Sequence, residues 1–63
     1  MEKLLTLEEA ARFTSTGVRF WRRLVFERRI PVVKVGRHVR IAESDLQRFV
    51  EDGRRPAVEA ASR

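Results

Sequence analysis

The segment Gly17–Arg40, GVRFWRRLVFERRIPVVKVGRHVR, changes its hydrophobic period in the middle and thereby decides the fold. Up to Glu27 the apolar residues recur at helical spacing. Ile30-Pro31 then ends the helix, because proline lacks a backbone donor and biases the residue before it toward extended backbone. After Pro31 apolar and polar residues alternate, which is typical of strands. We therefore expect a helix followed by a small β-hairpin.

The predicted helix, about Val18 to Glu27, has an apolar face and a basic face when each residue advances by about 100°. The apolar arc consists of Val18, Phe20, Trp21, Leu24 and Val25. The opposite arc consists of Arg19, Arg22, Arg23, Phe26 and Glu27. We expect Trp21 and Phe20 in the core. For Phe26 two interpretations stay open: it packs under the hairpin, or it is exposed to a neighbouring protein.

The hairpin is predicted over residues 32–41, VVKVGRHVRI, where basic and apolar side chains alternate on both sides of a turn. Gly36, Arg37 and His38 form the centre of this pattern, so an arginine is expected at the tip. Lys34 and Arg40 lie on the two predicted strands. The hairpin thus carries a second group of basic residues, in addition to the group on the helix.

A first helix, about Leu7 to Phe13, is predicted from a capping box in which Thr6 is followed three residues later by Glu9. Residues 14–17, TSTG, make a polar break that fits a turn into the following helix. A last helix begins at Glu43 or Ser44 and ends near Gly53. Its expected apolar stripe is Leu46, Phe49 and Val50.

Together these elements predict a mainly α fold with a small β-hairpin. Residues 1–53 form the expected domain, and residues 54–63, rich in Arg, Ala, Pro and Ser, form a flexible basic tail. The chain contains no cysteine, and no apolar run approaches the roughly 20 residues of a membrane span. We expect a soluble, cytoplasmic protein whose small core depends on a few apolar side chains.

Charge is segregated along the chain. Residues 17–40 carry eight basic residues against one acid, a net +7, whereas residues 1–16, 41–52 and 53–63 carry −1, −3 and +2. A merely soluble surface would intersperse the two signs, so this block predicts a polyanionic partner, with nucleic acid as the first candidate.

The helix-turn-helix arrangement places its second helix in the DNA major groove, where arginine pairs with guanine and phosphate contacts set the register. A hairpin beside that helix forms a wing that can reach the backbone or a narrow minor groove. We therefore predict a winged helix-turn-helix that binds double-stranded DNA. The residues expected at DNA are Arg19, Arg22, Arg23, Arg37, Lys34, Arg40, Thr16, His38 and Arg28.

No catalytic constellation is found. His38 is the only histidine and has no cysteine to share a metal site, so it is interpreted as a turn residue near phosphate. The acids near the last helix are explained by capping and a solvated face rather than by paired-carboxylate chemistry. We expect no enzymatic activity, no metal and no cofactor.

Three ordered segments carry a family resemblance: LLTLEEAA at 4–11, IPVVKVG at 30–36 and RIAESDLQRFV at 40–50. They resemble the excisionase family of winged-helix DNA-binding domains, which are similar in fold to the DNA-binding heads of mercury-resistance-type regulators. Two departures stand out. The family commonly has Gly-Val-Ser where this chain has Ser15-Thr16-Gly17, and a glycine where it has Arg28.

The resemblance implies a recombination directionality factor of a phage or mobile element, which binds repeats in attachment-site DNA, bends them and helps an integrase excise. Head-to-tail copies on DNA, in the cytoplasm of a bacterial host and at its nucleoid, would follow. A small winged-helix transcriptional repressor is the alternative. A basic protein-interaction or membrane-surface module is a third, although the core aromatics leave no free lipid-facing stripe.

Overall fold

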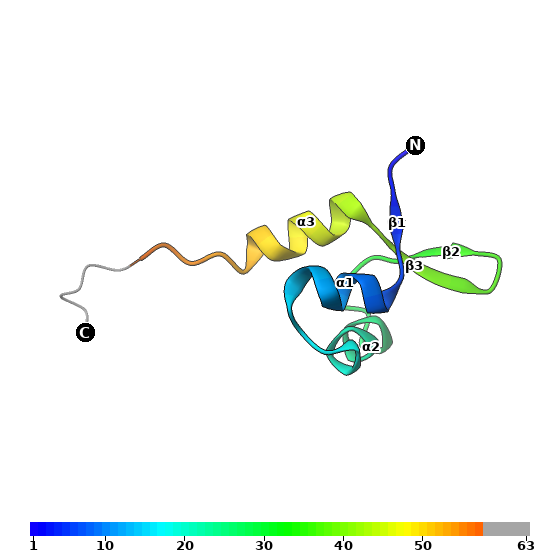
Figure 1. The fold of residues 1–63 in the computed structure, drawn as a ribbon, viewed down its shortest axis with the longest axis horizontal. Coiled ribbons are helices and arrows are strands. Elements are labelled where there is room, and N and C mark those ends of the chain that lie inside the picture. Colours follow the sequence, from blue (N-terminus) through cyan, green and yellow to red (C-terminus); the bar gives the residue numbers. More distant parts are fainter. Residues whose placement is uncertain (58–63) are drawn as a thin grey trace.

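The computed structural model describes residues 1–57, which form three helices and a three-stranded antiparallel sheet (Figure 1). In chain order the elements are β1 (Leu4–Leu5), α1 (Leu7–Thr14), α2 (Val18–Phe26), β2 (Val33–Val35), β3 (His38–Ala42) and α3 (Glu43–Asp52). The predicted order of helix, turn, helix, hairpin and helix is confirmed. The sheet has one strand more than the sequence predicted.

That extra strand is β1, which pairs with β3 through Leu4 opposite Ala42 and Leu5 opposite Ile41. On its other side β3 pairs with β2, so the sheet order is β1-β3-β2. A strand of two residues is too short to show alternation, which is why the sequence pattern did not reveal it. The pairing ties the N-terminal segment to the end of β3.

The same N-terminal segment caps α3. The preceding residue, Ala42, has no side chain that can accept a hydrogen bond. Instead the Glu2 carboxylate accepts the backbone N–H of Ser44 at 2.9 Å and its hydroxyl at 3.1 Å, and the Lys3 carbonyl accepts the N–H of Glu43 at 3.0 Å. Donation by the Ser44 N–H lowers the pKa of Glu2. An acid distant in the sequence thus satisfies exposed donors of this helix.

The predicted capping box of α1 is confirmed. The Thr6 hydroxyl accepts the Glu9 N–H at 3.0 Å, and the Glu9 carboxylate accepts the Thr6 N–H at 2.9 Å. The latter bond is the largest cause of a lowered pKa of Glu9. Because both donors at the helix start are satisfied locally, α1 begins at a defined residue.

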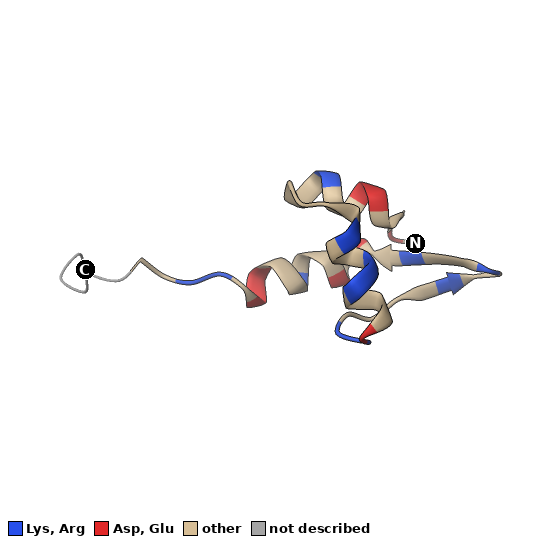
Figure 2. Ribbon diagram, turned by 90° about the horizontal axis from the view of Figure 1, so that it is seen from below, with Lys and Arg blue, Asp and Glu red and all other residues tan. Residues whose placement is uncertain are grey.

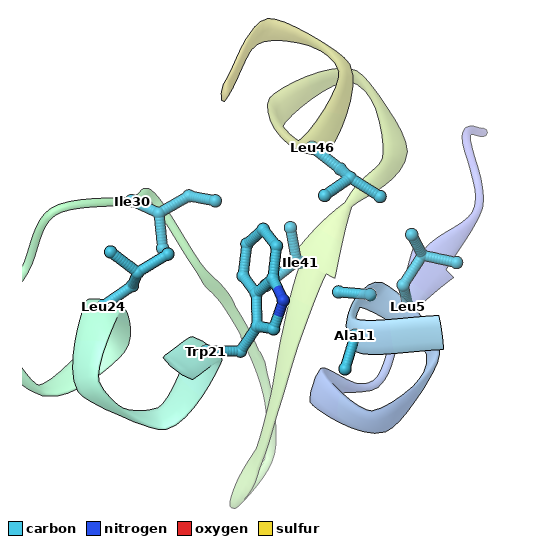
Figure 3. Close-up of a cluster of buried hydrophobic side chains, with 8 residues drawn as sticks. Leu5, Ala11, Trp21, Leu24, Ile30, Ile41 and Leu46 are labelled. Atoms are coloured by element: carbon cyan, nitrogen blue, oxygen red, sulfur yellow. The ribbon is translucent and has the colours of Figure 1, made fainter. Parts of the chain in front are cut away.

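Trp21 lies at the centre of the core, with 1% of its surface exposed (Figure 3). Its neighbours in the buried cluster come from every helix, from β1 and β3, and from the segment between α2 and β2: Leu5, Ala10, Ala11, Leu24, Ile30, Ile41 and Leu46. The indole N–H donates to the Thr16 hydroxyl at 2.7 Å, which supplies the partner that a buried tryptophan needs. The expectation that Trp21 is a core residue is confirmed.

Two expectations about the core are wrong. Phe20 is 44% exposed, because it lies at the edge of the apolar arc, and its ring meets Trp21 edge-on at 5.4 Å between centroids. Val50 is 46% exposed, because the roll of α3 turns Leu46 inward and leaves only Phe49 half-buried beside it. For Phe26 the structure decides between the two interpretations: it is 87% exposed and does not pack under the hairpin.

Replacing the central aromatic tests this account of the core. Trp21→Ala is expected to lower the free energy of unfolding by about 3–5 kcal/mol, because it removes a fully buried large side chain. Phe13→Ala is the control, since Phe13 is 68% exposed and its loss should change stability by no more than about 0.5 kcal/mol. Urea unfolding followed by circular dichroism measures both. Equal losses would contradict the assignment of the core.

Candidate nucleic-acid interface

Basic residues gather on α2 and on the β2–β3 hairpin, whereas acidic residues lie on α1 and α3 and just past the end of α2 (Figure 2). On α2, Arg19, Arg22 and Arg23 are all exposed. Trp21 and Leu24 of the same helix are each 1% exposed, so they fix which face of α2 is turned inward. The core therefore orients the arginines toward solvent.

The N-terminus of α2 differs from those of the other two helices. The first turns of α1 and α3 contain acids, Glu8 and Glu9 in one and Glu43 and Asp45 in the other, but the first turn of α2 contains none. Its N-cap is Gly17, which has no side chain to accept a hydrogen bond. The partial positive charge at this helix end thus adds to the charge of the arginines instead of being offset.

Most of the basic residues in this region have no protein partner. Within residues 1–57 the ion pairs are Arg29 with Glu27 at 3.6 Å and Arg54 with Glu51 at 2.9 Å. In the same part of the chain no side-chain hydrogen bond or ion pair involves Arg19, Arg22, Arg23, Arg28, Lys34 or Arg37. Their charges are available to an anionic ligand.

The hairpin extends away from the helices and carries Arg37 at its tip (Figure 1). Gly36 has a φ of +65°, a backbone conformation that glycine adopts without steric cost at the first position of a two-residue turn. Lys34 and His38 are exposed on the two strands. Arg40 is half-buried, and its guanidinium donates to the Val39 carbonyl at 2.9 Å.

Thr16, which was predicted from the sequence to contact DNA, lies at the surface just before α2. Its hydroxyl accepts the Trp21 indole N–H and lies 2.9 Å from the Thr14 hydroxyl. Thr14 in turn donates to the Ala10 carbonyl at 2.8 Å. The hydroxyl of Thr16 therefore links the turn to the core.

Arg28 lies at the joint between α2 and the wing in the left-handed region, with φ +56°. The N–H of Arg28 donates to Val25 O at 3.1 Å, and that of Arg29 donates to Leu24 O at 2.9 Å. These two bonds are those of a Schellman motif, in which the left-handed residue is usually glycine. The departure from the family pattern noted at this position therefore places a charged side chain where glycine is favoured. Ser15, with φ +56°, ends α1 in the same way.

The predicted basic tail lies partly outside the described residues. Arg54 to Ala57 are exposed and form neither helix nor strand. Arg54 donates to both oxygens of Glu51 at 3.0 and 2.9 Å, which lowers the pKa of that carboxyl. The proposal that residues 58–63 belong to the tail lies outside the described residues.

Sequence reasoning did not assign two features of this surface. The left-handed backbone at Arg28 was indicated only by the family glycine that it replaces. Phe26 was recognised as lying among arginines, but its burial could not be decided, because helical periodicity does not show where the hairpin folds. Another exposed apolar region lies elsewhere, in a hollow of about 380 Å³ lined by Phe13, Phe20 and Val50 among others.

These elements define a winged helix-turn-helix: α1 and α2 are joined by a short turn, a hairpin wing follows α2, and α3 follows the wing. Comparison with protein families gives the same class, since the model of a family described as a helix-turn-helix domain matches residues 4–54. The chain belongs to this family, whose members bind DNA, and membership implies that this protein binds DNA. Comparisons with curated proteins and with solved structures gave no significant match.

No helix within residues 1–57 is both long enough and apolar enough to cross a bilayer.

The left-handed residue at the joint gives a stability test. Arg28→Gly is expected to raise the free energy of unfolding by about 1 kcal/mol. Glycine avoids the roughly 1–2 kcal/mol steric cost of this conformation, but part of that gain is lost because glycine increases the conformational entropy of the unfolded chain. Arg29→Gly removes the same charge at a position without positive φ and is the matched control. It should not stabilise the protein. Urea unfolding compares them, and an equal gain for both would contradict the argument from backbone strain.

Proposed function

We propose that this protein is an excisionase, a sequence-specific factor that binds and bends attachment-site DNA and directs integrase-mediated recombination toward excision. The observation that carries the proposal is the division of one unpaired basic surface between a helix face and a projecting wing tip. The resemblance of three sequence segments to excisionases supports it, as does membership of a family that includes excisionase-like proteins.

In this proposal α2 enters the major groove. Arg19, Arg22 and Arg23 point away from the core, and arginine recognises guanine through its O6 and N7 atoms or binds phosphate. Thr16 and Arg28, at the two ends of α2, are the flanking contacts. Because Thr16 uses its hydroxyl on Trp21, its contribution is mainly to hold the start of α2 in position.

The wing supplies the second contact. Arg37 at the tip is proposed to reach the adjacent minor groove or its phosphates, where a narrow groove strengthens the negative potential. Lys34 and His38, both exposed, and the half-buried Arg40 are proposed to contact the backbone along the strands. A protein that holds neighbouring grooves in this way favours DNA that curves toward it, because bending permits more contacts.

A single module of this kind buries only on the order of 600–1,000 Å² on DNA, so useful affinity needs additional partners. We propose that adjacent copies bind head to tail on repeated sites and that an integrase binds beside them. The setting would be the cytoplasm of a bacterial host, at the nucleoid. The membrane-surface alternative is disfavoured, since the basic face of α2 carries three arginines and one apolar residue, Phe26.

The proposed contacts are tested by the salt dependence of duplex binding. Log K is expected to fall against log salt with a slope of about −4 to −5 if roughly five phosphates are neutralised. Arg22→Ala and Arg23→Ala should each weaken binding, and the loss of a phosphate contact should reduce the slope by about one. Arg48→Ala, an exposed arginine on α3, is the control and should change neither. Fluorescence anisotropy measures affinity, and thermal unfolding should be unchanged. If both helix variants unfolded, the assignment of the α2 faces would be wrong.

The function itself is tested by DNA bending and excision. Circular-permutation gels with attachment-site DNA from the host element should show position-dependent mobility when the protein is bound. Addition of the protein to an integrase reaction on the same DNA should raise excision. Binding without bending and without any effect on excision would refute the excisionase proposal and favour a winged-helix repressor.

A further inference from the structure

Phe26 is the last residue of α2, and its angular position falls within the basic face of that helix. With about 100° per residue, Phe26 falls roughly 20° from Arg19 and between Arg22 and Arg23 on the helical wheel. Its side chain is 87% exposed, the largest exposed fraction among the aromatic residues of the described chain. The buried residues Trp21 and Leu24 belong to the opposite side of the helix. An apolar ring therefore lies at the C-terminal end of the face that carries the three arginines.

One ligand must cover both the ring and the arginines, because they share a single helix face. Arg19 and Phe26 are separated by about 10.5 Å along the helix axis, which is comparable to the roughly 12 Å width of the DNA major groove. A polyanion that also offers an apolar contact is therefore needed. In the major groove that contact is the 5-methyl group of thymine, which no other base carries.

We propose that Phe26 is a specificity-determining residue that reads the 5-methyl group of thymine in the major groove. The arginines of the same face bind phosphates or guanine and set the depth of α2 in the groove, and the ring then excludes water from the methyl group. This inference rests on the proposed placement of α2 in the major groove. It adds a preference for thymine at a defined position of the binding site.

The alternative occupant is a second protein, including another copy of this chain. Its surface would have to accept the arginines that share the face with Phe26. The residues of α2 include no acid, and Glu27 is the C-cap residue just past its end. The hollow lined by Phe13, Phe20 and Val50 lies away from the basic face of α2. A ligand there would not have to accept the arginines of that face. Charge thus favours DNA over protein as the ligand at Phe26.

The test uses deoxyuridine, which pairs as thymidine does but lacks the 5-methyl group. Duplexes are first selected from a random-sequence pool with the full-length protein, and each thymidine of the selected duplex is then replaced singly by deoxyuridine. Wild-type affinity should fall by about fourfold at one or two positions, the factor expected for one buried methyl group. Phe26→Ala should bind the thymidine duplex more weakly, by a similar factor, and should not distinguish the two bases at those positions.

Phe26→Leu is the matched control, because it keeps an apolar side chain and should retain part of the discrimination. Both variants change an exposed side chain, so unfolding by urea should be nearly the same as for the wild type. The four affinities of protein and base at one position form a double-mutant cycle that isolates the contact between ring and methyl group.

The outcomes separate this inference from the proposed function. If the wild type binds duplexes with a steep salt dependence but deoxyuridine has no effect, or has the same effect on Phe26→Ala, the reading of thymine is refuted and the DNA-binding role stands. If Phe26→Ala instead alters self-association in sedimentation while its base discrimination is unchanged, the ring belongs to a protein interface and the inference is also refuted. If no duplex is bound, both the inference and the proposed function fail.

Discussion

The hydrogen bond from the Trp21 indole to the Thr16 hydroxyl, together with the burial of the ring, is the constraint on which the rest of the structure depends. The bond spans 2.7 Å and joins the second helix to the turn that precedes it. A ring buried among residues of the three helices, β1 and β3 fixes the roll of α2 about its axis. Since Arg19, Arg22 and Arg23 are placed by the same helical periodicity, that roll decides where their charges point. Packing in the core therefore sets the electrostatics of the surface.

The wing is positioned by a second set of interactions, in the sheet. β3 is the central strand: it pairs with β2 to form the wing and with β1, which brings the N-terminal segment to the start of α3. Glu2 then caps α3, and the helix continues directly from β3 without a loop. Because no helix within residues 1–57 lies against the outer end of the hairpin, the orientation of the hairpin depends on Ile41 and Ala42 at the buried end of β3, which are 0% and 5% exposed. A short N-terminal strand thus supports the strand that carries the hairpin.

The sequence predicted the helices and the hairpin well, because each is signalled locally. Thr6 and Glu9 mark a helix start, Pro31 ends a helical period and Gly36 marks a turn. The errors arise where tertiary position decides. Phe20 borders the apolar arc of α2, and only the placement of α1 and α3 determines whether it is covered. Strand β1 and the Glu2 cap involve partners about 40 residues away, so no local pattern indicates them. For the site, periodicity placed the arginines on one face, but the exposure of Phe26 and the partner of Thr16 needed the fold.

Both residues that flank α2 in the left-handed conformation, Ser15 and Arg28, are non-glycine, and each carries a steric cost of about 1–2 kcal/mol. In a small domain with a limited core this cost is a large part of the total stability. Glycine would form the same two Schellman hydrogen bonds, so the bonds do not explain the arginine. An outlier of this kind points toward function rather than packing, because the side chain of Arg28 is exposed and without a partner in the described chain. Its position between the helix face and the wing places a cation where the two proposed DNA contacts meet.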